Sequence, residues 1–340
     1  MSTSVPSGKA FIYASPNFTW CEEFRLKKVI KNRDVFIKTV HAALNPLDYK
    51  VPELLPFWLM FKGEPVGHDV CGIVEAVGDK VTQFEIGDCV FGVAPACAEY
   101  TIAHESMLAK VPGENSREKT AVYASLPGSG CTALYMLERS GVLRSNQPQR
   151  IVVIGASGGV GSCLVQIAKH KLPPGSTIVG VCSKKSAEYV RSIGASEIVD
   201  YTAPNFVISD AIETGSIDAV FDTVTSPDDP DYVTEGIKLV KAATGRYLAA
   251  NTKNQSEWIR AGIARQTGLG WWGRKQYELI MVDQKQEYLH ELAEMVESGK
   301  LKINIDREFP FQEKTLLEAL DLLRSRHVRG KVVVNLRNIQ

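Results

Sequence analysis

A glycine-rich stretch between an apolar run and an amphipathic segment is the first place where this sequence could do chemistry. Residues 151–155 read IVVIG, and a helix with an apolar period is predicted over 158–171. A glycine turn at that junction lets backbone N–H groups approach a pyrophosphate, and the helix N-terminus adds partial positive charge. Alanine stands where the first glycine of such a turn usually stands. We predict a dinucleotide site made by Ala156, Ser157, Gly158, Gly159, Val160 and Gly161.

The residues after the next apolar run indicate which dinucleotide is bound. The predicted strand 177–182 ends in Ser183-Lys184-Lys185, where NAD-binding proteins carry a carboxylate for the ribose 2′-hydroxyl. A hydroxyl and two ammonium groups complement a 2′-phosphate instead, through charge-assisted hydrogen bonds. The competing interpretation is that both lysines are ordinary solvated residues in the first turn of a helix, the end where cations are disfavoured. We predict NADPH rather than NADH.

Short aliphatic runs alternating with amphipathic segments surround these residues from about 120 onward. Strands are predicted at 151–155, 177–182, 197–201, 218–222 and 245–250, with helices over 158–171, 185–193 and 231–241 and a short one after 201. This alternation predicts a doubly wound parallel sheet. Residues 9–111 instead contain five strand-like runs punctuated by Gly, Pro and Asp (9–13, 35–44, 70–77, 89–93 and 99–103), which indicates a mainly β half.

The tail supplies two further amphipathic helices, near 286–298 and 312–326, and a last strand over 331–336. We expect these elements to fold with the first half of the chain. The resulting prediction is a discontinuous domain of residues 1–123 and 268–340, and a nucleotide-binding domain of residues 124–267.

Composition excludes several classes of partner. Lys plus Arg equals Asp plus Glu at 39 each, so no overall field favours nucleic acid. The N-terminal residues lack a basic region followed by an apolar run, and no apolar run reaches the ~18 residues that span a bilayer. The seven cysteines show no CxxC spacing and are expected to be reduced thiols. We therefore expect a soluble, cytoplasmic protein.

Several further motifs, in a fixed order, resemble the medium-chain dehydrogenase/reductase superfamily. They are ALNPLD at 43–48, GHDVCG at 67–72, VGDKVTQFEIGDCV at 77–90, LP at 126–127, GCTA at 130–133 and RGKVV at 329–333. The chain is most similar to the zinc-free quinone oxidoreductase branch, with its zeta-crystallin-like and enoyl-reductase-like members. The resemblance covers nearly the whole chain, and it implies an α/β fold with a GroES-like mainly-β catalytic domain plus a Rossmann domain.

The resemblance also implies that no metal is bound. Zinc alcohol dehydrogenases of the superfamily hold their catalytic metal with a Cys, a His and a second Cys. The matching positions here are Asn45, His68 and Gly128, and one imidazole nitrogen cannot hold zinc. The cysteine-rich lobe of those enzymes has no counterpart, since 91–100 is a short connection. His68 is expected to hydrogen-bond within the fold.

By the same resemblance, Asn45 and Asp48 lie near the nicotinamide, and Cys131 and Thr132 line its other side. Tyr201 joins Ser183 and Lys184 at the 2′-phosphate. Asn251 and Lys331 match positions that pass beside the cofactor.

A hydride transferred from the nicotinamide to an electron-poor carbon leaves negative charge on the substrate oxygen, which needs hydrogen-bond donors. The candidates are Asn45, Lys50 and Thr132, and Tyr49 is the one tyrosine near enough in sequence to supply a proton. Tyr49 as a packing residue, with protonation from solvent, is the alternative. The aromatic-rich segments 54–61 and 268–272 would cover the substrate, or else pack in the core or at a dimer interface.

Three functions remain open at this point. The first is an NADPH-dependent reductase of quinones or α,β-unsaturated carbonyls, without zinc. The second is a catalytically weak nucleotide-binding sensor or membrane-associated binding protein on the same fold, because fold alone does not settle chemistry. The third is an aldehyde reductase. The expected partners are a small-molecule substrate and a second copy of the chain in a homodimer, with no nucleic acid; peripheral membrane contact is the remaining option.

Overall fold

The chain folds into two compact units. The computed structural model describes residues 6–14, 17–26, 30–50, 52, 59–225, 230–254, 256–258, 260–261 and 276–337. Unit 1 contains Met1–Cys131 and Gln284–Gln340, and unit 2 is Thr132–Asp283. Both boundaries lie further along the chain than the predicted boundaries at 123/124 and 267/268. The first falls within helix α4 (Pro127–Ser140), and the second follows strand β13 (Tyr277–Leu279), which is only three residues long and was not predicted.

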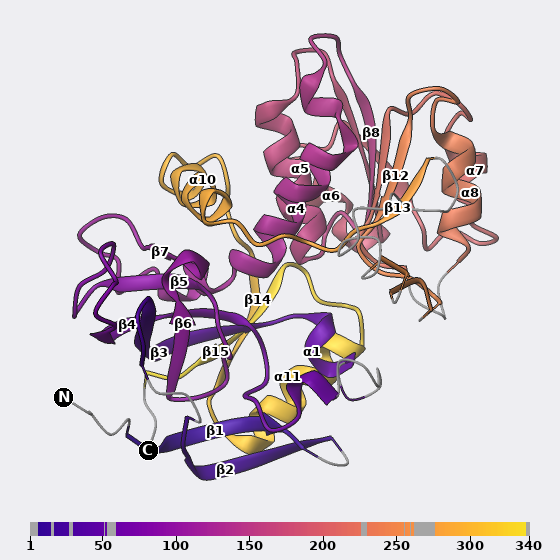
Figure 1. The fold of residues 1–340 in the computed structure, drawn as a ribbon. Helices are drawn as coiled ribbons and strands as arrows, with labels where there is room; N and C mark the ends of the chain where they lie inside the picture. Colours follow the sequence, from indigo (N-terminus) through magenta and orange to yellow (C-terminus); the bar gives the residue numbers. More distant parts are fainter. Residues whose placement is uncertain are drawn as a thin grey trace. The chain divides into compact units, whose positions relative to one another are not determined.

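Unit 2 is built on a six-stranded sheet in which every pair of neighbours is parallel (Figure 1). Its order is β10-β9-β8-β11-β12-β13, the order of a Rossmann fold. The strands are β8 (Arg150–Ile154), β9 (Thr177–Cys182), β10 (Glu197–Asp200), β11 (Ala219–Asp222) and β12 (Arg246–Ala249), followed by β13. The doubly wound parallel sheet is therefore confirmed, with one strand more than predicted.

Helices lie on both faces of this sheet, which explains why its strands are almost continuously apolar. Figure 1 shows α5 (Gly159–Lys171) and α6 (Ala187–Ser192) on one face, and α7 (Ile208–Ala211) and α8 (Tyr232–Leu239) on the other. Asp231 caps α8 by accepting a hydrogen bond from the Thr234 N–H. The core between these layers is apolar and contains Val152, Val179, Val220, Leu239 and Tyr247.

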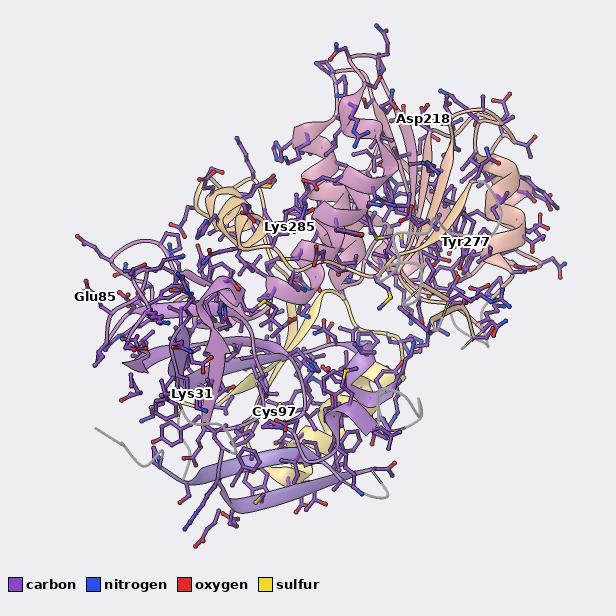
Figure 2. All side chains as sticks on the ribbon, viewed as in Figure 1. Lys31, Glu85, Cys97, Asp218, Tyr277 and Lys285 are labelled. Atoms are coloured by element: carbon purple, nitrogen blue, oxygen red, sulfur yellow. The ribbon has the colours of Figure 1, made fainter. Side chains whose placement is uncertain are left out.

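Charged side chains at the amino-terminal edge of the sheet are used to join its elements. Asp218, which is labelled in Figure 2, directly precedes β11. It accepts a hydrogen bond from the Arg150 N–H at 2.9 Å and pairs with the Lys241 ammonium at 2.6 Å. In a parallel sheet ligands bind at the opposite, carboxyl edge. That edge is where the candidate site must be sought in unit 2.

Unit 1 is mainly antiparallel β. Its large sheet has the order β14-β15-β3-β4-β5-β7, with β6 paired to β3. The bounds are β3 (Asp34–Leu44), β4 (Asp69–Val77), β5 (Cys89–Val93), β6 (Tyr100–His104), β7 (Leu108–Lys110), β14 (Ile305–Pro310) and β15 (Lys331–Asn335), and a separate hairpin joins β1 (Gly8–Tyr13) to β2 (Phe18–Phe24). All five strands predicted in the first half and the last strand are confirmed, whereas β2, β7 and β14 were not predicted.

The two predicted helices of the tail are present in unit 1 as α10 (Gln286–Glu297) and α11 (Glu313–Arg324). Helix α11 packs against the short helix α1 (Pro46–Lys50). The seven cysteines are free thiols, and six of them are buried. Within the described residues no helix is long and apolar enough to cross a membrane.

Candidate functional site

The glycine turn lies at the carboxyl edge of the unit 2 sheet, between β8 and α5. Gly155 has a φ of +81°, a conformation that favours glycine, and a Cβ there would lie 2.4 Å from Val224 Cγ1. A Cβ at Gly161 would lie 2.1 Å from the Gly155 carbonyl oxygen. The structure therefore requires glycine at both positions. The essential first glycine is Gly155, assigned to the strand in the sequence analysis, and Ala156 is simply the buried residue after it.

The N-terminus of α5 is open to an anion. Gly158 is its N-cap, with extended backbone, and a glycine has no side chain to bond the N–H groups of the first turn. A Cβ on Gly158 would come no closer than 3.5 Å to the Gly155 oxygen, so the glycine leaves room rather than relieving a clash. Orphan N–H groups and the helix dipole together suit a pyrophosphate. This part of the chain fits a dinucleotide.

The residues predicted at the 2′-phosphate come from the ends of two neighbouring strands. Ser183 and Lys184 follow β9, and Tyr201 follows β10, which pairs with β9 through Asp200 and Cys182. Asp200 was not predicted from the sequence. Its Oδ1 accepts hydrogen bonds from the Lys184 N–H (3.0 Å) and from the N–H and hydroxyl of Thr202 (2.9 and 2.6 Å). Asp200 therefore ties the two strand ends together.

These contacts, those from Thr202 foremost, lower the pKa of the Asp200 carboxyl, and the Lys184 charge acts in the same direction. Asp200 is therefore a carboxylate at neutral pH. Its negative charge opposes the binding of a 2′-phosphate, whereas the positive charges of Lys184 and Lys185 favour it.

The switch point of the sheet, where the strand order reverses between β8 and β11, is braced by polar contacts. The Thr223 hydroxyl donates to the Ile154 carbonyl at 2.8 Å. Asp222 is fully buried at the end of β11 and accepts hydrogen bonds from the N–H groups of Val224 and Thr225 and from the hydroxyls of Thr225 and Tyr247. Burial raises the pKa of the Asp222 carboxyl, and these four hydrogen bonds act in the opposite direction. Asp222 therefore organises the loop that faces Gly155.

We expect Asp222→Ala to lower the stability of the protein by at least about 3 kcal/mol, because four donors lose their acceptor and a buried unsatisfied donor costs about 1–3 kcal/mol. Tyr247→Phe removes one donor and is expected to cost only about 1 kcal/mol. Thermal unfolding of both variants beside the wild type measures the difference. Equal losses in the two variants would contradict this role of Asp222.

Strand register brings a second group of polar side chains together in unit 1. Asn45 follows β3, Asp69 begins β4 and Lys331 begins β15; β3 lies between the other two strands, with Ala43 opposite Asp69 and Leu44 opposite Val332. The Lys331 ammonium lies 2.6 Å from Asn45 Oδ1 and 3.2 Å from Asp69 Oδ2. Asn45 Nδ2 donates to Asp69 Oδ2 at 2.9 Å, and the Gly128 N–H donates to Asp69 Oδ1 at 2.8 Å.

Asp48 and His68 lie next to this group but are occupied by other contacts. Asp48 Oδ2 accepts a hydrogen bond from the Asn45 N–H at 2.7 Å, which fixes the turn into α1. His68 Nδ1 lies 3.6 Å from Asp48 Oδ1, and its imidazole meets the Phe61 ring edge to face. The Asp48 carboxyl group is buried, and through its hydrogen bond to the Asn45 N–H it orders the backbone at Asn45.

The positions that match zinc ligands do not fit a metal. A Cβ on Gly128 would lie 2.7 Å from Asp69 Oδ2, so no cysteine side chain can be accommodated there without displacing that carboxylate. Asn45 is bonded to an ammonium, which repels a metal cation. In the part of the chain that the structure describes, no three His, Cys, Asp or Glu side chains are grouped to hold a metal ion.

The remaining predicted site residues are placed individually. Tyr49 lies on α1 with the Arg324 guanidinium 5.5 Å from its ring centroid and the Lys50 ammonium 5.9 Å from it. Thr132 lies on α4 and is the first residue of unit 2, and Asn251 follows β12. Residues 54–58 and 268–272 lie outside the described residues. The roles predicted for Tyr49, Thr132, Asn251 and these two segments stay predictions.

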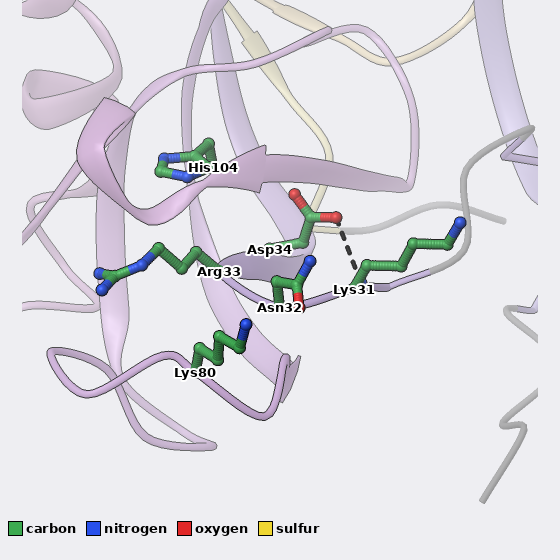
Figure 3. Close-up of a pocket in the computed structure, with 6 residues that line it drawn as sticks. All are labelled: Lys31, Asn32, Arg33, Asp34, Lys80 and His104. Atoms are coloured by element: carbon green, nitrogen blue, oxygen red, sulfur yellow. Dashed lines mark hydrogen bonds between the residues drawn. The ribbon is translucent and has the colours of Figure 1, made fainter.

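A surface pocket of about 380 Å³ in unit 1 contains none of the predicted residues. It is lined by Lys31, Asn32, Arg33, Asp34, Lys80 and His104 (Figure 3). The Arg33 guanidinium pairs with the buried carboxylate of Glu105, and Asp34 accepts a hydrogen bond from the Lys31 N–H at 3.2 Å. The Arg33 charge is thus paired with a carboxylate, whereas the bond to Asp34 comes from the Lys31 backbone and not from its ammonium.

Known proteins match both units. Residues 31–143 match the family model described as alcohol dehydrogenase GroES-like domain, and residues 193–334 match the model described as zinc-binding dehydrogenase. The chain is 31% identical over 319 residues to 2-methylene-furan-3-one reductase of Solanum lycopersicum, covering 90% of this chain and 72% of that protein. It is 30% identical over 318 residues to the chloroplastic NADPH-dependent alkenal/one oxidoreductase of Arabidopsis thaliana, with the same coverage of 90% and 72%.

Among solved structures, the quinone oxidoreductase from Coxiella burnetii superimposes with a TM-score of 0.78 at 28% identity, covering 97% of this chain and 99% of that one. The order of motifs, the two folds and these similarities agree. The chain belongs to the medium-chain dehydrogenase/reductase superfamily, in its branch of quinone oxidoreductases and enoyl reductases.

Proposed function

We propose that this protein is an NADPH-dependent reductase of α,β-unsaturated carbonyl compounds or quinones that works without zinc. The observation that carries the proposal is the cradle of Gly155, Gly158 and Gly161 at the uncapped N-terminus of α5. The relatives reported above are named for reduction of a methylene-furanone, of alkenals and alkenones, and of quinones. Their shared chemistry is reduction of an electron-poor double bond.

The chain's own residues divide this work between the two units. In unit 2, the backbone N–H groups of Gly159 and Val160 would bind the pyrophosphate, and Ser183, Lys184, Lys185 and Tyr201 would bind the 2′-phosphate. When bound, NADPH supplies the hydride. In unit 1, Asn45 has an amide N–H to offer a substrate oxygen, and Lys50 is a further candidate donor; in unit 2, Thr132 is another. Asn251 remains a candidate for a cofactor contact, whereas the Lys331 ammonium is bonded to Asn45 and Asp69.

The proton that completes the reduction is assigned to solvent. Tyr49 packs beside Arg324 and against the core of unit 1, which suits a packing residue better than an acid. Hydride addition to the β-carbon of an enone gives an enolate, and water then protonates the α-carbon. A quinone that accepts one hydride likewise takes up one proton from water to give the hydroquinone.

Turnover with three classes of acceptor tests the proposal. The loss of nicotinamide absorbance is followed with an alkenone, with phenanthrenequinone and with a saturated aldehyde. We expect the first two to oxidise NADPH, and the alkenone product to be the saturated ketone by mass spectrometry and NMR. An allylic alcohol as product would favour the aldehyde-reductase function. NADPH binding without turnover of any acceptor would favour the nucleotide-sensing function.

We also propose that the protein is a homodimer and that it is located in the cytoplasm. Leu59 and Met60 leave 71% and 68% of their surface exposed, which is unusual for adjacent large apolar residues and suits a protein contact. Light scattering is expected to give the mass of a dimer, and Leu59→Glu/Met60→Glu to reduce it toward that of a monomer. A monomeric wild type that sediments with lipid vesicles would favour the peripheral membrane contact instead.

A further inference from the structure

The ion pair between Asp69 and Lys331 is almost completely buried. The two side chains are 2% and 4% exposed, and the ammonium lies 3.2 Å from the carboxylate. Removing both charges from water costs several kcal/mol per ion, and such pairs are often no more stable than apolar residues of the same volume. A contribution to stability therefore does not explain why this ion pair is present. The group that it contacts suggests another reason.

Asn45 is held at both ends of its side-chain amide by these opposite charges. Its Oδ1 accepts from the Lys331 ammonium at 2.6 Å, and its Nδ2 donates to Asp69 Oδ2 at 2.9 Å. The flipped amide would turn its NH₂ toward an ammonium and its oxygen toward a carboxylate, so one orientation is strongly favoured. The second N–H of Asn45 has no partner among the residues that the structure describes, and its direction is thereby fixed.

Asp69 is itself held in place. Its other oxygen, Oδ1, accepts the Gly128 N–H at 2.8 Å, and a side chain at position 128 would collide with the carboxylate. A hydrogen-bond network thus surrounds the neutral side-chain amide of Asn45. It consists of the two buried charges of Asp69 and Lys331 and the fixed backbone N–H of Gly128.

We propose that Asp69 and Lys331 are positioning residues, which lock the Asn45 amide so that its remaining N–H donates to the oxygen of the unsaturated carbonyl or quinone substrate. This rests on the proposed function. As hydride reaches the substrate, negative charge grows on that oxygen, and a donor fixed in advance stabilises it without reorganising. Lys331 then acts on the substrate through Asn45 and is not primarily a cofactor contact.

Three variants separate this role from a purely structural one. Lys331→Met and Asp69→Asn each leave one buried charge unpaired, so both are expected to unfold at lower temperature than the wild type. In the double variant no charge remains. Asn at position 69 turns an NH₂ toward Asn45, whose amide then flips to present its oxygen, and the unfolding temperature is expected to recover.

The expected result is that kcat does not recover with stability. In the double variant we expect kcat with the alkenone to stay at least about 100-fold below that of the wild type, and the NADPH dissociation constant to stay within about twofold. Lys119→Met/Glu297→Gln neutralises another ion pair of unit 1, with 2.8 Å between its charged atoms, and is the matched control with normal kcat. Recovery of kcat together with stability would show that the pair is structural. Weaker NADPH binding with intact kcat would make Lys331 a cofactor contact.

A second readout does not need turnover. In protein labelled at asparagine nitrogen, the side-chain amide signals of Asn45 are identified by their loss in Asn45→Ala. We expect one of the two protons to be shifted downfield by the Asp69 carboxylate in the wild type, and this shift to vanish in the double variant. Identical amide signals in the two proteins would overturn the proposed lock. Absence of turnover in the wild type, with the shifted proton present, would refute the proposed function alone.

Discussion

Gly161→Ala is expected to weaken NADPH binding by at least about 100-fold, equivalent to about 2.8 kcal/mol, and to lower the unfolding temperature. The added Cβ would lie 2.1 Å from the Gly155 oxygen and 2.9 Å from the Ala156 Cα, so backbone must move on both sides of the turn. Because the same turn presents the N–H groups of α5, the cradle cannot keep its shape. Titration calorimetry and thermal unfolding measure the two effects.

Gly158→Ala is the matched control, three residues away in the same turn. Its Cβ meets nothing closer than 3.5 Å and its φ of −78° is ordinary for alanine, so the unfolding temperature is expected to stay unchanged. The methyl group projects where a pyrophosphate would approach, and NADPH binding should therefore still weaken, by about tenfold. A stable Gly158→Ala variant with wild-type affinity would mean that the pyrophosphate does not contact this turn.

Lys184→Glu/Lys185→Glu is expected to shift the preference for NADPH over NADH toward NADH by ~1–3 kcal/mol, the range for hydrogen bonds to charged groups. Asp200 already places a carboxylate at these strand ends, so two further acidic residues would leave the 2′-phosphate without a cationic partner there. Dissociation constants of both coenzymes for both proteins give the shift directly.

Lys169→Glu/Lys171→Glu makes the same change in net charge at the exposed C-terminal turn of α5. This control should retain the wild-type ratio of the two coenzymes. An equal shift in both double variants would indicate a general effect of charge, and no shift in either would refute the assignment of Lys184 and Lys185 to the 2′-phosphate.

The architecture of unit 2 was predictable because its signals are local. Apolar runs such as IVVIG and TIVGVC are bounded by glycine, proline and charged residues, and each of them forms a strand within one residue of the predicted bounds. Strands that are short or have few apolar residues were not predicted. Strand β14 reads IDREFP and is exposed at four of six positions, and β13 pairs with the sheet through only three residues.

The group around Asn45 could be predicted only in part. Asn45 and Lys331 were singled out through resemblance, but Asp69 was not, because its bond to Lys331 joins residues 262 positions apart and no local pattern reports such a contact. The signal that does exist is indirect: each residue stands at one end of a strand, and antiparallel register aligns those ends. Asp200 was missed for a related reason, since its partners follow from the pairing of β9 and β10.

The central claim is that a phosphorylated nicotinamide coenzyme binds to the glycine turn of unit 2. Isothermal titration of the wild-type protein with NADPH and with NADH tests it most directly. The structure leads us to expect saturable binding of one NADPH per chain, and NADH at least about fivefold weaker, equivalent to about 1 kcal/mol. No heat of binding with either coenzyme, or tighter binding of NADH, would contradict it.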